Sequence, residues 1–178
     1  MKKIYLSVVC LLISIPLIAQ LYVEPEKEVE CSVFLAKEGR GRAQQGLEIW
    51  DDYIFSCEDG GHVNIYDFKS ADPKPVAGFE LASSHPDNHV NNVCFGVETK
   101  RGASFPLLYI TNGKVGSELE WLCFVESITR RGKRFSSEIA QTIELDGSKW
   151  AEKGYVSIFG APSWLVDRER IYMDILGA

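Results

Sequence analysis

The chain has 178 residues, a formal charge of −6 at pH 7 and a sequence pI of about 5.1. This acidic balance argues against a nucleic-acid-binding protein, because binding to a phosphate backbone needs clustered positive charge. Hydrophobic residues make up 46% of the chain, which is long enough for one domain with a sizeable core.

The N-terminus has the pattern of a secretory signal peptide. Two lysines precede an apolar run over residues 4–18, and the small residue Ala19 follows it. The run is short for a membrane-spanning helix, and Pro16 would interrupt one. We therefore predict a signal peptide over residues 1–19, cleaved after Ala19 or Gln20. The mature protein is then exported to the periplasm, outer surface or medium, has a formal charge of −8, and has no membrane span.

The cysteines that remain after cleavage do not have the paired short spacings of a zinc site. An exported protein can oxidise its cysteines, so disulfides are one interpretation. Each of these cysteines, however, lies within an apolar, strand-like run, which favours small buried hydrophobic side chains. The residues concerned are Cys31, Cys57, Cys94 and Cys123.

Residues 20–41 are predicted to form an N-terminal segment with one strand at residues 29–35. A first group of short apolar runs then follows, separated by turn residues such as Asp51-Asp52 and Gly60-Gly61. Glycine after aspartate supplies the positive φ that a tight hairpin turn needs. This pattern predicts an antiparallel meander with strands over residues 47–50, 53–57, 63–68 and 76–81.

A second group of apolar runs repeats this organisation, with strands predicted over residues 90–97, 107–111, 120–127 and 139–145. The basic run at residues 130–134 falls in its third turn. We interpret this run as a solvated hairpin tip that discourages pairing with other chains, with a heparin or nucleic-acid patch as the alternative. The rest of the chain predicts one helical turn at residues 148–153 and strands at 157–159, 164–166 and 171–176.

The sequence therefore predicts an all-β protein, and runs such as residues 107–110 are apolar on both faces, so the sheets must be covered on both sides. Consecutive four-stranded meanders of this kind resemble the blades of a β-propeller. More narrowly, QQGLEIWDDYIFSCEDGGHVNIYDF, HPDNHVNNVCFG and FPLLYITNG are similar to segments of exported β-propeller-like proteins of Bacteroidetes-type bacteria. The resemblance covers residues 42–178, lacks the Trp-Asp and Kelch signatures, and implies a scaffold rather than an activity.

A propeller ring needs four or more blades, whereas the third meander here ends after its second strand. We therefore expect a partial β-propeller over residues 42–178 that is truncated at its C-terminus, being the N-terminal part of a longer protein. In the complete ring, the strand at residues 29–35 would pair as the outer strand of the last blade. A β-sandwich, or a partial propeller completed by self-association, is the alternative.

In a propeller, the loops after every second and every fourth strand share one face. On this interpretation all three histidines of the chain gather there together with acidic and amide side chains. His89 and Asn91 lie two residues apart in an extended segment, so both side chains can point into the channel. The predicted ligand-binding face consists of Glu58, Asp59, His62, His85, Asp87, His89, Asn91 and Asn112.

The segment HPDNH at residues 85–89 could supply His85, Asp87 and His89 to a divalent cation, with an ordinary Asx-type turn as the alternative. No GxSxG or HExxH motif is present, and no cofactor is required by the sequence. We predict an exported scaffold that binds a protein or glycan partner. The alternatives are a propeller enzyme, a carbohydrate- or ester-directed hydrolase or lyase using these three residues, and a purely structural envelope component.

Overall fold

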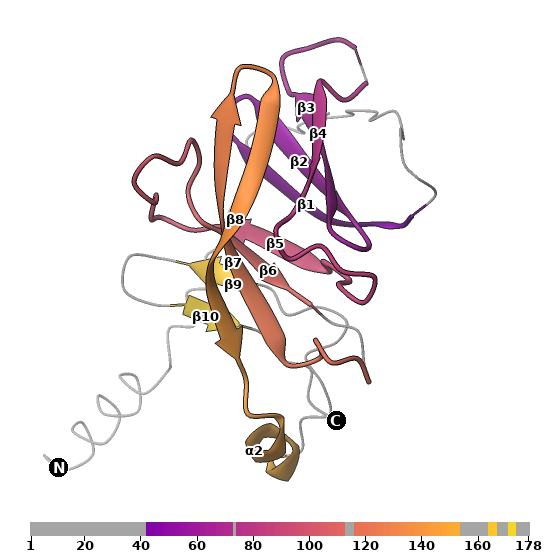
Figure 1. The fold of residues 1–178 in the computed structure, drawn as a ribbon, viewed down its shortest axis with the longest axis vertical. Coiled ribbons are helices and arrows are strands. Elements are labelled where there is room, and N and C mark those ends of the chain that lie inside the picture. The colour runs from indigo at the N-terminus through magenta and orange to yellow at the C-terminus, as the bar shows by residue number, and fades with distance from the viewer. Residues whose placement is uncertain (1–41, 73, 113–115, 154–163, 167–170, 174–178) are drawn as a thin grey trace, which may run out of the picture. The chain divides into compact units, whose positions relative to one another are not determined.

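The structure is a computed structural model that describes residues 42–72, 74–112, 116–153, 164–166 and 171–173. Its strands form two four-stranded antiparallel sheets and one two-stranded sheet (Figure 1), so the all-β prediction is confirmed. The predicted signal peptide and the strands at residues 29–35 and 157–159 lie outside the described residues. Within the described ranges, no helix is both long and apolar enough to cross a membrane.

The first sheet is the predicted first meander, with its four strands in the order β1-β2-β3-β4. Gly60 and Gly61 connect the two central strands with φ angles of 85° and 93°, a conformation that glycine adopts without steric cost. Asp51 makes the first turn with a φ of 54°. The strands are β1 (Gln44–Trp50), β2 (Tyr53–Glu58), β3 (His62–Asp67) and β4 (Ala77–Glu80).

The second sheet has the same simple order, β5 (Asn92–Phe95), β6 (Leu108–Thr111), β7 (Leu122–Arg131) and β8 (Arg134–Glu144). The predicted third and fourth strands were too short at their shared turn. Both continue to a tight turn around Gly132, whose φ is 65°. The basic side chains of this turn are exposed, while Ile128 and Phe135 next to it are buried. The basic run at residues 130–134 therefore lies at the exposed tip of a hairpin, as the sequence predicted, and the strands beside it are longer than predicted.

The remaining elements also match the prediction. The short helix α2 (Gly147–Glu152) lies where one helical turn was predicted. β9 (Trp164–Val166) and β10 (Ile171–Met173) pair as an antiparallel ladder, and β9 contacts β5.

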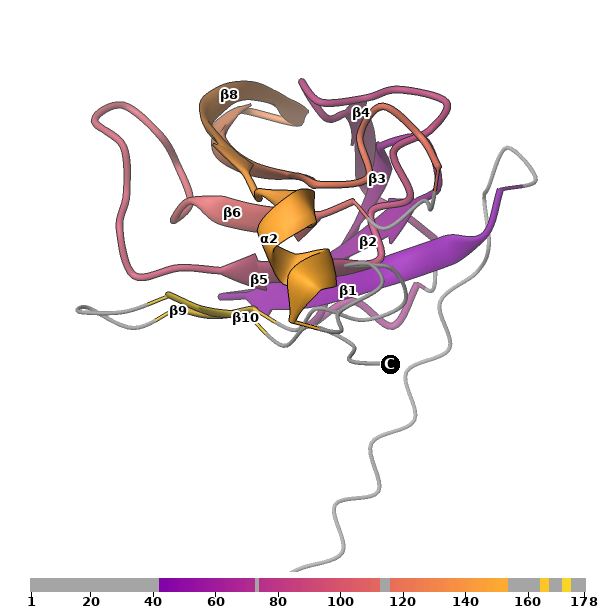
Figure 2. The same ribbon diagram turned by 90° about the horizontal axis from the view of Figure 1, so that it is seen from below.

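The main core lies between the two four-stranded sheets. β1 contacts β5 and β4 contacts β8, and Figure 2 shows β1 beside β5 and the strong curl of β8. The centre is an aromatic cluster in which the Phe55 ring lies 5.0 Å from Phe95 and 5.1 Å from Phe105. A second cluster around Tyr109 and Val125 occupies the other face of the second sheet. The prediction of sheets that are apolar on both faces is confirmed for this sheet.

The cysteines at positions 57, 94 and 123 are all thiols in this structure. Cys57 and Cys123 are fully buried, which confirms their interpretation as small core residues, and Cys94 is half-buried. Burial raises the pKa of the Cys57 thiol, and it raises the pKa of the Cys123 thiol to about 12. Cys31 lies outside the described residues.

Candidate functional site

Three connections meet at one end of the two sheets, and we call this surface the loop face. It comprises residues 58–61 between β2 and β3, residues 81–91 between β4 and β5, and residues 112 and 116–121 between β6 and β7. The Gly60 N–H donates to the Asn88 carbonyl at 2.7 Å. The His89 N–H donates to Asn112 Oδ1 at 3.0 Å. Hydrogen bonds therefore hold the three connections together.

A buried asparagine, Asn88, fixes the conformation of the long connection between the sheets. Its side chain is 1% exposed. Its Nδ2 donates to the Ser83 carbonyl at 2.9 Å, and its Oδ1 accepts the Val90 N–H at 3.2 Å. Val90 has a φ of 44°, an uncommon value for a β-branched residue. The asparagine thus closes an Asx-type turn that places His89 on the loop face.

A second buried group supports this connection from the neighbouring sheet. Glu126 is 0% exposed, and its carboxylate accepts the Ser83 N–H at 2.8 Å and the Ala82 N–H at 3.0 Å. A register shift between Val125 and Glu126 marks an irregularity in β7 at this point. Sequence reading missed this residue, although a single carboxylate within the apolar run of β7 was the available signal.

Each of the three histidines faces a carboxylate from another segment. His89 Nδ1 lies 2.9 Å from Asp59 Oδ1, and the two form an ion pair when the imidazole is protonated. His85 Nε2 lies 3.5 Å from Glu118 Oε1. His62 Nδ1 lies 3.0 Å from Glu80 Oε1 across the β3–β4 ladder.

The structure places the predicted site residues in two groups. The first group is at the surface of the loop face, where His85, His89 and Asp59 make the contacts above, Asn112 fixes the His89 backbone, and the Asp87 N–H donates to His85 Nδ1 at 3.2 Å.

The second group lies deeper or to one side. Glu58 is 0% exposed, and its Oε1 accepts from Asn64 Nδ2 at 2.8 Å, so this carboxylate belongs to the first sheet rather than to its surface. His62 faces β4. The Asn91 N–H continues the ladder by donating to the Thr111 carbonyl at 3.2 Å.

No three histidine, cysteine, aspartate or glutamate side chains lie close enough to hold a metal ion among the described residues, which include the predicted triad. The physical reason is that the two imidazoles of residues 85–89 turn toward different carboxylates. His89 faces Asp59 while His85 faces Glu118.

The hydroxyls of the two serines before His85 form hydrogen bonds within and between the loops. Ser84 Oγ donates to the Gly60 carbonyl at 2.6 Å, and Ser83 Oγ accepts from Asn88 Nδ2 at 3.1 Å. The Ser83 side chain is also buried. Ser84 Oγ also lies 3.4 Å from Glu80 Oε2, the carboxylate that faces His62. These hydroxyls hold the loop in place.

A cavity of about 580 Å³ adjoins the His85–Glu118 contact. Its lining combines several carboxylates with one half-buried indole, a combination that can accept hydrogen bonds and offer an apolar ring face. Hydrogen bonds from Ser148 and Lys149 lower the pKa of Asp146 to about 2, so this carboxylate is ionised at neutral pH. The lining residues are Ser117, Glu118, Glu120, Trp121, Leu122, Glu144, Leu145, Asp146 and Ser148.

The sequence did not predict this cavity. The signal was the acidic residues around Trp121, which were read only as part of a strand. A scan against known protein families and a search of the curated proteins each find no match for this chain.

Proposed function

We propose that the protein is an exported, non-enzymatic scaffold that binds a protein or glycan partner on the loop face. We also propose that its sheets stack radially, as the blades of a β-propeller do. Two contacts support this stacking, because β1 meets β5 and β4 meets β8, which pairs first strand with first and fourth strand with fourth. The contact of β9 with β5 extends the same series.

The observation that carries the binding role is the carboxylate-lined cavity beside His85 and Glu118. Carboxylate oxygens accept hydrogen bonds from hydroxyl groups, and an indole ring packs against the C–H face of a sugar ring. This chemistry suits a neutral or amino-bearing glycan, or a basic segment of a partner protein. The hydrogen bonds that join the three connections keep the surface preorganised, which reduces the entropy lost on binding.

The proposal is tested with the mature protein on arrays of neutral and amino oligosaccharides, followed by calorimetric titration with the best binder. We expect Trp121→Ala, Glu118→Gln and His89→Ala each to weaken binding about tenfold or more. The thermal midpoint should change little in Glu118→Gln and His89→Ala, and should fall in Trp121→Ala because this ring packs against the second core cluster. Glu98→Gln, an exposed carboxylate on the β5–β6 connection, is the matched control and should bind as the wild type does. Unchanged affinity in all three site variants would contradict a ligand site on the loop face.

A second function is favoured by one observation, the 2.9 Å approach of His89 Nδ1 to Asp59 Oδ1. An imidazole positioned by a carboxylate is a common general acid–base pair. The enzyme alternative is a carbohydrate- or ester-directed hydrolase or lyase that uses this pair. It requires turnover of chromogenic glycosides or esters that Asp59→Asn abolishes while glycan binding persists, and binding without any turnover would rule it out.

A further inference from the structure

The β7–β8 hairpin has two chemically distinct faces near its tip. Ile128, Arg130, Phe135 and Ser137 face the first sheet. The Phe135 ring lies 5.9 Å from Tyr53, and Ser137 Oγ accepts the Ala82 N–H at 2.9 Å. Directly paired residues of an antiparallel ladder share a face. The opposite face therefore carries the pairs Ser127↔Glu138, Thr129↔Ser136 and Arg131↔Arg134.

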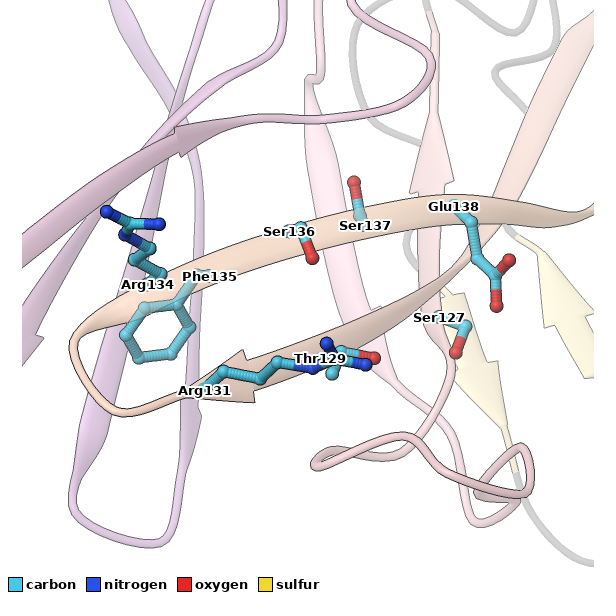
Figure 3. A pocket seen from close by; sticks show the side chains of 8 residues that line it. All are labelled: Ser127, Thr129, Arg131, Arg134, Phe135, Ser136, Ser137 and Glu138. Atoms are coloured by element: carbon cyan, nitrogen blue, oxygen red, sulfur yellow. The ribbon is translucent and has the colours of Figure 1, made fainter.

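This second face borders a groove of about 920 Å³, which Figure 3 shows from close by. In this view Arg131 extends along β7 toward Thr129, and Glu138 is directed from β8 toward Ser127. The groove lies at the far end of β7 from the loop face, since β7 begins at that face and ends at the hairpin tip. Its lining residues are Ser127, Thr129, Arg131, Arg134, Phe135, Ser136, Ser137 and Glu138.

The charges of the hairpin are only partly compensated. Lys100 Nζ binds Glu138 Oε1 at 2.9 Å, which neutralises the one carboxylate of the groove. Arg130 is occupied as well, because its Nε donates to the Gly132 carbonyl and its guanidinium lies 4.9 Å from the centre of the Tyr53 ring. Arg131 and Arg134 form no ion pair with any residue that the structure describes.

These two arginines are also direct cross-strand partners. From this pair the two side chains extend in different directions, Arg131 along β7 and Arg134 away from it (Figure 3), and both are exposed. Each guanidinium has a planar set of donors that matches a carboxylate or sulfate group. The hydroxyls of Thr129 and Ser136 lie one ladder pair away and can exchange hydrogen bonds with sugar hydroxyls.

We propose that this groove is a binding site for an acidic glycan, in which Arg131 and Arg134 each contact a carboxylate or sulfate group and Thr129 and Ser136 contact the adjoining sugars. The lining explains this choice of ligand. Its one aromatic residue, Phe135, is 9% exposed and packs toward the core, so the groove offers neither a stacking platform for nucleobases nor an apolar anchor for a protein partner.

The test is calorimetric titration of the wild-type protein with a tetrasaccharide of uronic acid, a sulfated tetrasaccharide and a neutral tetrasaccharide of the same length. We expect the acidic probes to bind more tightly than the neutral one and to weaken as salt is raised. The double variant Arg131→Gln/Arg134→Gln should lose about tenfold or more of the affinity for the acidic probes. Arg101→Gln, an exposed arginine outside the groove, should bind as the wild type does. Equal thermal midpoints would show that the variants are folded.

Three outcomes would overturn the proposal. They are equal affinity for acidic and neutral probes, wild-type affinity in the double variant, and preferential binding of single-stranded DNA that depends on both arginines. The site is independent of the loop face, because Trp121→Ala should leave acidic-glycan binding unchanged and the arginine variants should leave loop-face binding unchanged. Failure of either site is therefore distinguishable from failure of the other.

Discussion

At the scale of single residues, the loop face depends on a carboxylate that never reaches its surface. Glu126 accepts two backbone N–H groups of the connection between the sheets. On one side of these groups Leu81 is buried in the main core, while Ala82 and Ser84 are exposed. Glu126 therefore links the core of the second sheet to the segment that carries His85 and His89.

We predict that Glu126→Ala lowers the free energy of unfolding by about 2–4 kcal/mol, because it leaves the buried Ser83 N–H without an acceptor and a cavity behind, whereas the Ala82 N–H keeps its hydrogen bond to Ser137 Oγ. Glu126→Gln retains one acceptor oxygen and should cost about half as much. Urea titration of both variants measures the difference. A Glu126→Ala variant as stable as the wild type would show that water replaces the carboxylate at no cost.

The buried thiols give the fold a dependence on alkaline pH. The pKa of Cys123 is raised to about 12, whereas a thiol in an unfolded chain titrates near about 8.5. The stability contribution of the neutral thiol is complete below the unfolded pKa and is lost as pH rises from there toward 12. Burial also raises the pKa values of Cys57 and Tyr109, which acts in the same direction.

We therefore predict that the free energy of unfolding falls steadily above about pH 9 and that Cys123→Ala makes this fall shallower. Urea titrations between pH 7 and pH 10.5 provide the measurement. In the folded protein at pH 8, Cys57 and Cys123 should resist iodoacetamide and become reactive only in denaturant. Rapid alkylation of the native protein at either position would contradict the burial argument.

At the scale of elements, an aromatic cluster joins the two sheets. Phe135 of β8 stacks on Phe79 of β4 at 6.1 Å and on Phe105 at 5.9 Å, and it meets Tyr53 edge-on. These contacts tie the outer hairpin of the second sheet to the first sheet. They explain why β7 and β8 remain paired up to the arginine-rich turn.

We predict that Phe135→Ala lowers the free energy of unfolding by about 3–5 kcal/mol, since it removes a buried ring from this cluster. Ile139→Ala, on the same strand but 43% exposed, is the control and should change stability by less than about 1 kcal/mol. Hydrogen exchange should accelerate at the β7–β8 tip in Phe135→Ala. Equal losses in the two variants would mean that the hairpin does not depend on the cluster.

The same elements show what the sequence could predict. The strands of the first meander were readable because their turns consist of aspartate and glycine next to alternating apolar residues. The β7–β8 hairpin was predicted too short because Ile128 and Phe135, the buried apolar residues near its tip, are separated only by polar and basic residues and glycine.

The candidate site, too, could be predicted from the sequence only in part. The order of strands is enough to bring the histidine-bearing loops to one end of the sheets. Side-chain partners across loops, such as Asp59 with His89, depend on tertiary contacts that have no short-range signature. The burial of Glu58 likewise depends on packing around the first sheet rather than on the turn that follows it.

At the scale of the whole molecule, the two proposed sites have opposite charge. The cavity of the loop face is lined by four carboxylates, whereas the hairpin groove carries two arginines that form no ion pair within the described part of the chain. Such a separation lets one scaffold discriminate between ligands by charge, because each site repels what the other attracts.

Ligands of this kind are met outside the cell, so the proposed function depends on export. The predicted export signal is the apolar run at residues 4–18 with the lysines before it. We predict that expression in a bacterial host yields a product beginning at Gln20 or Leu21, and intact-mass measurement with N-terminal sequencing checks this. Leu11→Arg/Leu12→Arg places two charges in the run and should leave a full-length precursor inside the cell, because translocation requires an apolar segment.

The matched control is Ser14→Leu, which keeps the run apolar and should be processed and exported as the wild type is. A product that retains residue 1 and fractionates with the membrane would identify the run as an anchor instead, and one that stays soluble inside the cell would reject export. In the first case the binding sites would be displayed at a membrane surface, and in the second they would not meet extracellular glycans. The N-terminal sequence of the product therefore determines which ligands the two sites can encounter.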